Sequence, residues 1–237
     1  MARHWRIKAG LALMVVVAAG YVAYLEVQAS DDTDEIISSS AVWNPSLSDL
    51  GRIQQGCVAA GNFSDCFAEK MAGEGVSEDA VNFTRSYAEL NHGTVALLTY
   101  FHPLDAVDLG IAYFPAGKEV HSSWVLLNGT PAIVDLNNLE QLPESQMQND
   151  SGYREMLEAH PRAKLFPAEA QPGISEPASE RLPDGGQRFT SVYSVRDGCR
   201  SCELLGQVDI SFLFSSSGDL KGIQFDSFHS AAPAPHQ

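Results

Sequence analysis

The chain has 237 residues, of which 15 are Lys or Arg and 30 are Asp or Glu, so its net charge is −15 at pH 7. This length allows one or two domains, and a hydrophobic content of 44% is enough for a folded core. The negative charge argues against nucleic acid as a partner, because a phosphate backbone would be repelled. It favours a basic partner instead, which we expect among envelope or secreted proteins.

The first 29 residues have the pattern of an export signal. Three basic residues among the first eight precede an uncharged run from 9 to 25. A basic start before an apolar run directs the chain outward and leaves the N-terminus inside. The run is long for a signal-peptide core and short for a membrane span. Two outcomes therefore stay open: a single-span inner-membrane anchor that faces the periplasm, or cleavage after Ala29 to give a periplasmic or secreted protein.

Residues 30–45 are rich in Ser, Asp and Thr and predict a spacer. An α+β region is expected at 46–166, and its first part predicts three short helices. Each of these helices follows a serine that can accept a hydrogen bond from the first turn, namely Ser46, Ser64 and Ser77. Between residues 80 and 90 the apolar residues recur at the spacing of one helix face, so we expect Phe83 and Tyr87 in the core.

Runs rich in β-branched and aromatic residues predict strands at 107–114, 124–127 and 132–135. Asn128-Gly129, between the last two runs, predicts a hairpin turn. The stretch 94–101 fits either a strand or a helix. One more short helix is expected from a cap at Ser151 to His160.

Residues 167–187 contain four prolines and three glycines without an apolar period, which predicts a long loop or linker. An antiparallel β region follows at 188–228, where apolar residues occupy every second position from Val208 to Phe214. Residues 229–237 predict a frayed tail. The fold class is therefore α+β, with short N-terminal helices followed by an antiparallel sheet with hairpins. The regions 46–166 and 188–228 fit one domain or two.

The chain has four cysteines: Cys57, Cys66, Cys199 and Cys202. An even number in an exported chain indicates disulfides, and the spacing favours the local pairs Cys57–Cys66 and Cys199–Cys202 among the three pairings. A bridge between the last two would close the tip between two strands. Arg200 and Ser201 would then be exposed on a rigid loop, which makes them candidates for contact with a partner.

The C-x2-C spacing of Cys199 and Cys202 also fits a thiol–disulfide exchange couple. A thioredoxin-like couple is followed by a long helix, whereas here only residues 203–206 separate the second cysteine from a predicted strand. A structural zinc site needs four ligands, and one cysteine pair with distant residues does not make a recognisable set. We therefore expect no metal and no cofactor, and keep redox exchange as an alternative function.

No complete catalytic signature occurs. His102 lies close to Asp105 and Asp108 in sequence, which is half of a base arrangement, but no G-x-S-x-G nucleophile elbow accompanies it. His121 is a neighbour of Ser122 in sequence only. The sequence thus assigns no catalytic residue. We expect a non-catalytic binding protein, and a hydrolase centred on His102 is a further alternative.

Residues 151–228 combine a short helix, a strand ending Val192-Tyr193-Ser194-Val195, a cysteine-closed loop and an alternating strand. This order resembles the periplasmic inhibitor of vertebrate lysozyme family, and the same order is similar to other bacterial envelope proteins. The resemblance implies a small α+β fold with a disulfide-closed loop between strands, and lysozyme inhibition as another alternative function. In that family the loop is longer and carries a histidine, whereas here only Arg200 and Ser201 lie between the cysteines.

Overall fold

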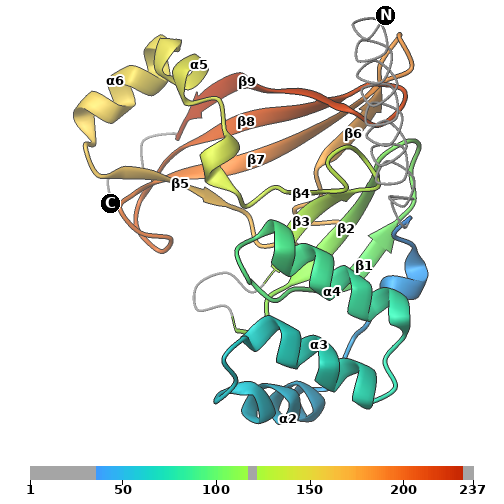
Figure 1. Cartoon of the computed structure of the whole chain (residues 1–237). Coiled ribbons are helices and arrows are strands. Elements are labelled where there is room, and N and C mark those ends of the chain that lie inside the picture. The colour runs from blue at the N-terminus through green and yellow to red at the C-terminus, as the bar shows by residue number, and fades with distance from the viewer. Residues whose placement is uncertain (1–35, 117–121, 232–237) are drawn as a thin grey trace, which may run out of the picture. The chain divides into compact units, whose positions relative to one another are not determined.

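The structure, a computed structural model, describes residues 36–116 and 122–231 and builds them from short helices and two antiparallel sheets (Figure 1). This is the α+β class expected from the sequence. The predicted export segment, the start of the spacer, His121 and residues 232–237 of the predicted tail lie outside the described residues. The tail was predicted to begin too early, since His229 and Ser230 belong to the last strand. Within the described ranges, no helix is long and apolar enough to span a membrane.

A 3-10 helix and three α-helices come first: η1 (Ser39–Ala41), α2 (Leu47–Cys57), α3 (Phe63–Gly73) and α4 (Glu78–Leu90). Ser46 and Ser77 each accept a hydrogen bond from a backbone N–H of the following turn, as predicted. The cap predicted at Ser64 is wrong. Asn62 accepts the hydrogen bond from the N–H of Asp65 and so starts α3 earlier, while the Ser64 hydroxyl donates to the Asn62 side chain.

The apolar stripe predicted on α4 is confirmed. Phe83 and Tyr87 are 2% and 1% exposed, and they pack with Leu98 and Val125 of the first sheet. Arg85, on the opposite side of the helix, is exposed. The amphipathic spacing therefore fixes which face of α4 covers the sheet.

The first sheet has the strand order β1-β2-β3-β4. Its strands are β1 (Leu97–His102), β2 (Asp108–Tyr113), β3 (Ser122–Leu127) and β4 (Ile133–Asp135). The stretch that fitted strand or helix is therefore mostly strand. The predicted hairpin joins β3 to β4, and Asn128 has a φ of 64°. Asn tolerates this left-handed conformation better than most residues, which accounts for its place in the turn.

The second sheet has the order β5-β7-β8-β9, and β6 also pairs with β7. Its strands are β5 (Ala163–Pro167), β6 (Ala178–Arg181), β7 (Gln187–Asp197), β8 (Leu204–Phe214) and β9 (Leu220–Ser230). Before it come η2 (Leu139–Gln141) and the helices α5 (Glu144–Asn149) and α6 (Ser151–Ala159). Figure 1 shows α5 and α6 beside β9.

The segment 167–187, predicted as a loop or linker, contains β6 and connects two strands of the same sheet. Its loop is held against the first sheet because the Trp124 indole N–H lies 3.3 Å from Ser175 Oγ and the Ser122 hydroxyl donates to the Ala170 carbonyl. The Pro- and Gly-rich segment 167–187 is therefore a folded connection between β5 and β7.

One shared core lies between the two sheets. Leu109 and Trp124 of the first sheet pack with Phe189, Tyr193 and Phe212 of the second, all of them buried. The Tyr193 hydroxyl donates to the Leu136 carbonyl at 2.7 Å, and burial raises the pKa of this tyrosine. The question left open by the sequence is answered by this core: from Ile37 onward the described residues form one compact unit.

Candidate functional site

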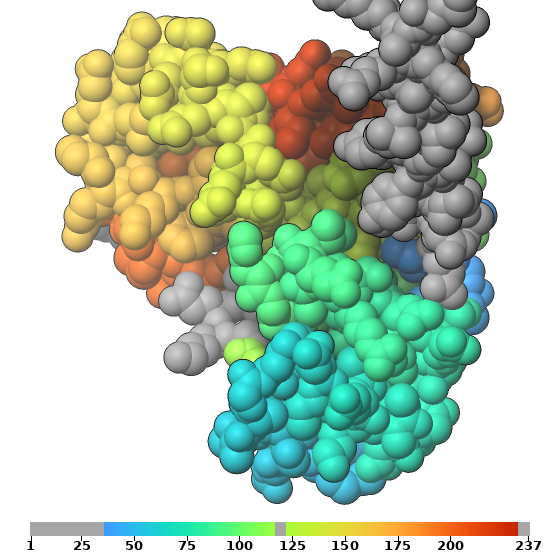
Figure 2. Space-filling model, in the orientation of Figure 1, coloured from blue at the N-terminus to red at the C-terminus, as the bar shows by residue number. Residues whose placement is uncertain are grey.

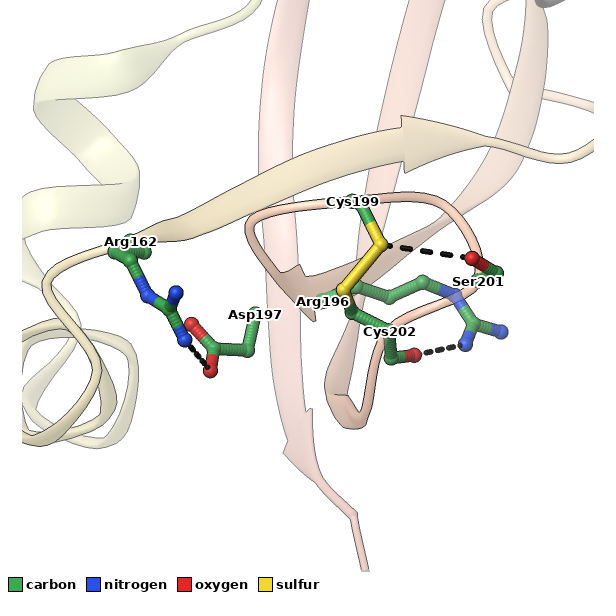
Figure 3. The surroundings of a disulfide bond; sticks show 6 residues. All are labelled: Arg162, Arg196, Asp197, Cys199, Ser201 and Cys202. Carbon is green, nitrogen blue, oxygen red and sulfur yellow. Dashed lines mark hydrogen bonds and ion pairs between the residues drawn. A yellow bond between two sulfur atoms is a disulfide. The ribbon is translucent and has the colours of Figure 1, made fainter.

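The turn between β7 and β8 is closed by the Cys199–Cys202 disulfide, as the spacing predicted (Figure 3). The Cα atoms of the two cysteines are 5.1 Å apart. We call residues 198–203 the disulfide loop. The N–H of Asp197 donates to the Glu203 carbonyl across the loop, and Gly198 adopts a φ of 87° that favours glycine.

The two residues between the cysteines differ in their surroundings. Ser201 is exposed, as expected. Arg200 is only half exposed, because its guanidinium donates to the Pro167 carbonyl at 2.8 Å and lies 5.5 Å from the ring centre of Phe166. These contacts fix the disulfide loop to β5. The expectation that Arg200 is exposed is therefore wrong, because a carbonyl and an aromatic ring of neighbouring β5 contact its guanidinium.

A groove of about 1280 Å³ lies beside the disulfide loop. Most of its lining comes from four segments, namely residues 90–95 at the end of α4, 135 and 137–140 around η2, 164–167 of β5 and 198–201 of the loop. Phe63, Tyr87, Phe114 and Ala116 complete it. Figure 2 shows this face, with the green end of α4 below the yellow region that contains η2. The groove is larger than the 300–1,000 Å³ of typical small-molecule sites, a size that suits a chain segment.

Part of the groove lining is apolar. It presents four large side chains that are partly or fully exposed, namely Phe63, Leu90, Phe114 and Leu139. Leu90 is 53% exposed, an unusual position for leucine at the end of a helix whose other apolar residues are buried. Apolar side chains gathered along a groove are typical of an interaction site.

Asp135 is the last residue of β4, contacts Tyr87 of α4 and lines the groove. Its carboxylate accepts hydrogen bonds from the hydroxyls of Tyr87 and Ser123 and, at 2.8 Å, from the N–H of Asn137. Burial and the nearby Asp135 raise the pKa of Tyr87, so this hydroxyl stays protonated as a donor. Sequence reasoning missed this network, since Asp135 reads only as the last residue of a short strand.

Two cations, Lys164 and Arg200, line the groove, and a third, Arg196, lies beside Lys164. We call Lys164, Arg196 and Arg200 the basic cluster. Lys164 and Arg196 are direct neighbours across β5 and β7. Among the residues that the structure describes, none of the three has a carboxylate within 4.0 Å. Figure 3 shows that Arg162, by contrast, pairs with Asp197 at 2.7 Å.

The cluster is unexpected in a chain with a net charge of −15. Like charges directly opposite in a sheet destabilise it, so this arrangement has a cost that packing does not explain. Arg196 gains a hydrogen bond from its Nη1 to the Cys202 carbonyl at 2.9 Å, and Arg200 bonds to a carbonyl also. Neither of these partners neutralises the positive charge.

The groups considered for base catalysis are not assembled. Asp105 faces Arg181 at 3.9 Å, and Asp108 accepts from the Leu104 N–H at 2.7 Å. His102 Nδ1 lies 3.5 Å from Glu176 instead. The two aspartates therefore have structural partners of their own, and the hydrolase alternative has no geometric support at His102.

A Ser–His–Asp set occurs on the second sheet but lacks triad geometry. His229 Nε2 lies 2.9 Å from Ser227 Oγ and 3.1 Å from Asp209 Oδ2. In a catalytic triad the two imidazole nitrogens face different partners, one the nucleophile and the other the carboxylate. Here a single nitrogen faces both, so no proton relay is formed.

The second predicted disulfide, Cys57–Cys66, links the end of α2 to α3 with a Cα separation of 5.7 Å. Cys57 is completely buried. This bridge lies within the helical layer, and neither of its cysteines lines the groove. In the described ranges no cluster of three or more His, Cys, Asp or Glu residues could hold a metal ion.

Comparisons of this chain with protein-family models, with curated proteins and with solved structures find no match.

Proposed function

We propose that this chain is an exported, non-catalytic binding protein that holds its ligand in the groove beside the disulfide loop. The observation that carries the proposal is the groove of about 1280 Å³ itself, which is lined by exposed apolar side chains and by the cations Lys164 and Arg200. Its disulfide loop is preorganised, since the bridge and the two contacts of Arg200 hold it against β5. Preorganised surfaces lose less entropy on binding.

Export is supported by the N-terminal charge pattern and by the cysteines. All four cysteines are paired, and structural disulfides persist mainly in oxidising compartments. Either a retained N-terminal span that faces the periplasm or cleavage after Ala29 is compatible with the proposal. A basic partner protein remains a proposal that rests on the net charge alone.

Export is tested with a reporter enzyme that is active only outside the cytoplasm, fused after Gln237. The reporter should be active, and an intact but inactive fusion would contradict export. Binding is tested by hydrogen exchange of the full chain in detergent, with and without envelope extract. The amides of Leu165 and Arg200 should exchange more slowly with extract, and unchanged exchange along all groove walls would contradict the site.

Thiol–disulfide exchange by Cys199 and Cys202 is a second candidate. It is favoured by the exposure of Cys199, which lines the groove and is therefore accessible to a thiol on a bound chain. A redox titration against glutathione decides between the two roles. A potential below about −300 mV is typical of a structural bridge, whereas one between roughly −120 and −270 mV is typical of exchange proteins. Lysozyme inhibition, implied by the resemblance, is tested directly by a lysozyme activity assay with the purified chain.

A further inference from the structure

The groove lies beside β5, the end strand of the second sheet. Among the described residues β5 pairs with β7 on one side only, and residues 164–167 of β5 line the groove. The N–H of Ala163 donates to the His160 carbonyl and the carbonyl of Pro167 accepts from Arg200, so the backbone groups of both residues point away from β7. Since backbone direction alternates along a strand, the N–H and carbonyl of Leu165 point to the same free edge.

Free backbone groups on an edge are satisfied by an added strand. A lipid or a small apolar molecule would leave them unpaired, whereas an extended peptide pairs with them through its own backbone. Pro167 has no N–H to donate, so the pairing is short and centred on Leu165. A short pairing needs further contacts from side chains to be stable.

Charged and apolar side chains of the groove lining supply those contacts. Lys164 and Arg200 are cations without a described carboxylate partner, and they flank the free edge. Leu90 and Leu139 are exposed elsewhere in the lining. Side chains of an extended segment point alternately to opposite faces, so acidic residues at every second position would share one face with the cations, while the apolar residues between them point to the other face.

We infer that the groove binds an extended acidic segment of another protein, which adds a strand to the free edge of β5 and pairs its carboxylates with Lys164 and Arg200. This inference rests on the proposed binding function and names its ligand class. It also accounts for the unfavourable pairing of Lys164 with Arg196, because an acidic ligand removes the repulsion. Asp135 and Glu140 also line the groove, so it is the two cations beside the free edge, and not the groove as a whole, that favour a ligand opposite in charge to the one that the net charge suggests.

The test measures binding of a fluorescent peptide of alternating Glu and Val to the full chain in detergent. A peptide with Lys in place of Glu should bind about tenfold more weakly, and added salt should reduce the difference. The Glu–Val peptide with N-methyl groups at every second residue should also bind about tenfold more weakly, because it cannot complete the backbone pairing. Equal affinities for the three peptides would overturn the inference.

Protein variants provide the second arm. Lys164→Glu changes an exposed residue without a described carboxylate partner and should weaken binding of the acidic peptide about tenfold. The Tm should be equal or slightly higher, because Glu opposite Arg196 replaces a like-charge pair. Arg85→Glu on the exposed face of α4 makes the same charge change away from the groove and should leave the affinity within about twofold. If both variants weaken binding equally, the effect is one of net charge and the inference is wrong.

Two further outcomes distinguish a failure of this inference from a failure of the proposed binding function. Binding of phosphatidylglycerol vesicles with the Lys164 dependence, without binding of the peptides, would assign the cluster to a membrane surface and reject the peptide ligand. Protection of groove amides by envelope extract, without preference for the acidic peptide, would reject the ligand class and leave the binding function intact.

Discussion

At the scale of single residues, Asp135 joins the helical layer to the first sheet. Its carboxylate takes one hydrogen bond from α4 through Tyr87, one from β3 through Ser123, and one from the backbone of Asn137. A half-buried carboxylate with three donors is stabilised without a cation, because each donor replaces water. The side chain therefore couples the position of α4 to the wall of the groove that contains residues 135–140.

Removal of one donor tests this coupling. Tyr87→Phe keeps the buried ring and deletes the hydroxyl, so urea unfolding of the full chain should give a free energy lower by about 1–2 kcal/mol. Tyr100→Phe is the matched control, since Tyr100 packs edge-on against Trp124 and its hydroxyl has no hydrogen bond within the described residues. An equal loss in both variants would assign the effect to the ring environment.

The hydrogen bond between Tyr87 and Asp135 also predicts how the free energy of unfolding depends on pH. The pKa of Tyr87 is raised in the fold, mainly by burial, above its ordinary value of about 10. The folded state then holds this proton more tightly than the unfolded state. The stabilisation that results from this raised pKa is fully present below pH 10 and is lost as the pH rises further. Unfolding curves between about pH 9 and 11 should show a smaller decline for Tyr87→Phe than for the unmodified chain.

At the scale of elements, the helical layer depends on a covalent link. α2 and α3 have 11 residues each, which is marginal for helices in isolation. The Cys57–Cys66 bridge closes a ten-residue loop between them, so Cys57→Ala with Cys66→Ala should lower the free energy of unfolding by roughly 2.5–3 kcal/mol. Replacement of Cys199 and Cys202 by Ala removes a smaller loop and should cost about 2 kcal/mol while it also weakens groove binding. Denaturant unfolding with a peptide-binding assay distinguishes the two bridges, and a reversed order of losses would contradict the assignment.

Two turns from different sheets also meet. The N–H of Thr130 donates to the Gly218 carbonyl and the N–H of Leu220 donates to the Thr130 carbonyl, which joins the β3–β4 turn to the β8–β9 turn. A Cβ on Gly129 would lie 2.8 Å from the Gly218 carbonyl oxygen. Gly129→Ala should therefore destabilise by about 1–3 kcal/mol. Gly222→Ala, where nothing lies within 4 Å of the added carbon, should change the melting temperature little, and similar shifts in both would argue against a clash.

The elements that sequence reasoning found are those with a strong local signal. α4 and β8 carry clear periods of 3.6 and 2 residues, and Asn128-Gly129 marks its turn. β6 was missed because all four of its residues are exposed, so no alternation of apolar and polar side chains is present. The apolar character that identifies most strands is absent from an outer strand of this kind.

The candidate site was predicted only in part, for a related reason. The spacing of Cys199 and Cys202 is local and gave the disulfide loop and its bridge. The groove unites segments near residues 90, 135, 165 and 200, and no local pattern reports such distances. The position of Arg200 depended on β5, a strand from an earlier part of the chain, and so its contacts required the fold.

At the scale of the whole described unit, the two sheets share one core. Trp124 lies between the sheets, and Trp43 packs with α2, α3 and α4. We therefore expect a single cooperative transition, with coincident unfolding curves from far-UV circular dichroism and from tryptophan fluorescence. Curves with separate midpoints would indicate that the helical layer unfolds independently of the sheets.

The hydrogen bonds of the Asn128 side chain determine which part of the fold a pulling force on the N-terminus would reach first. The Asn128 carboxamide accepts from the Ile37 N–H and donates to the Ile37 carbonyl, both at 2.7 Å, and donates also to Asp108. If the chain is pulled at its N-terminus, tension acts first on the two hydrogen bonds between Ile37 and Asn128. It acts next on η1, whose Ser40 carbonyl accepts a hydrogen bond from the Ser77 hydroxyl. The tension would thus pass to the β3–β4 turn, and none of the residues that make these hydrogen bonds lines the groove.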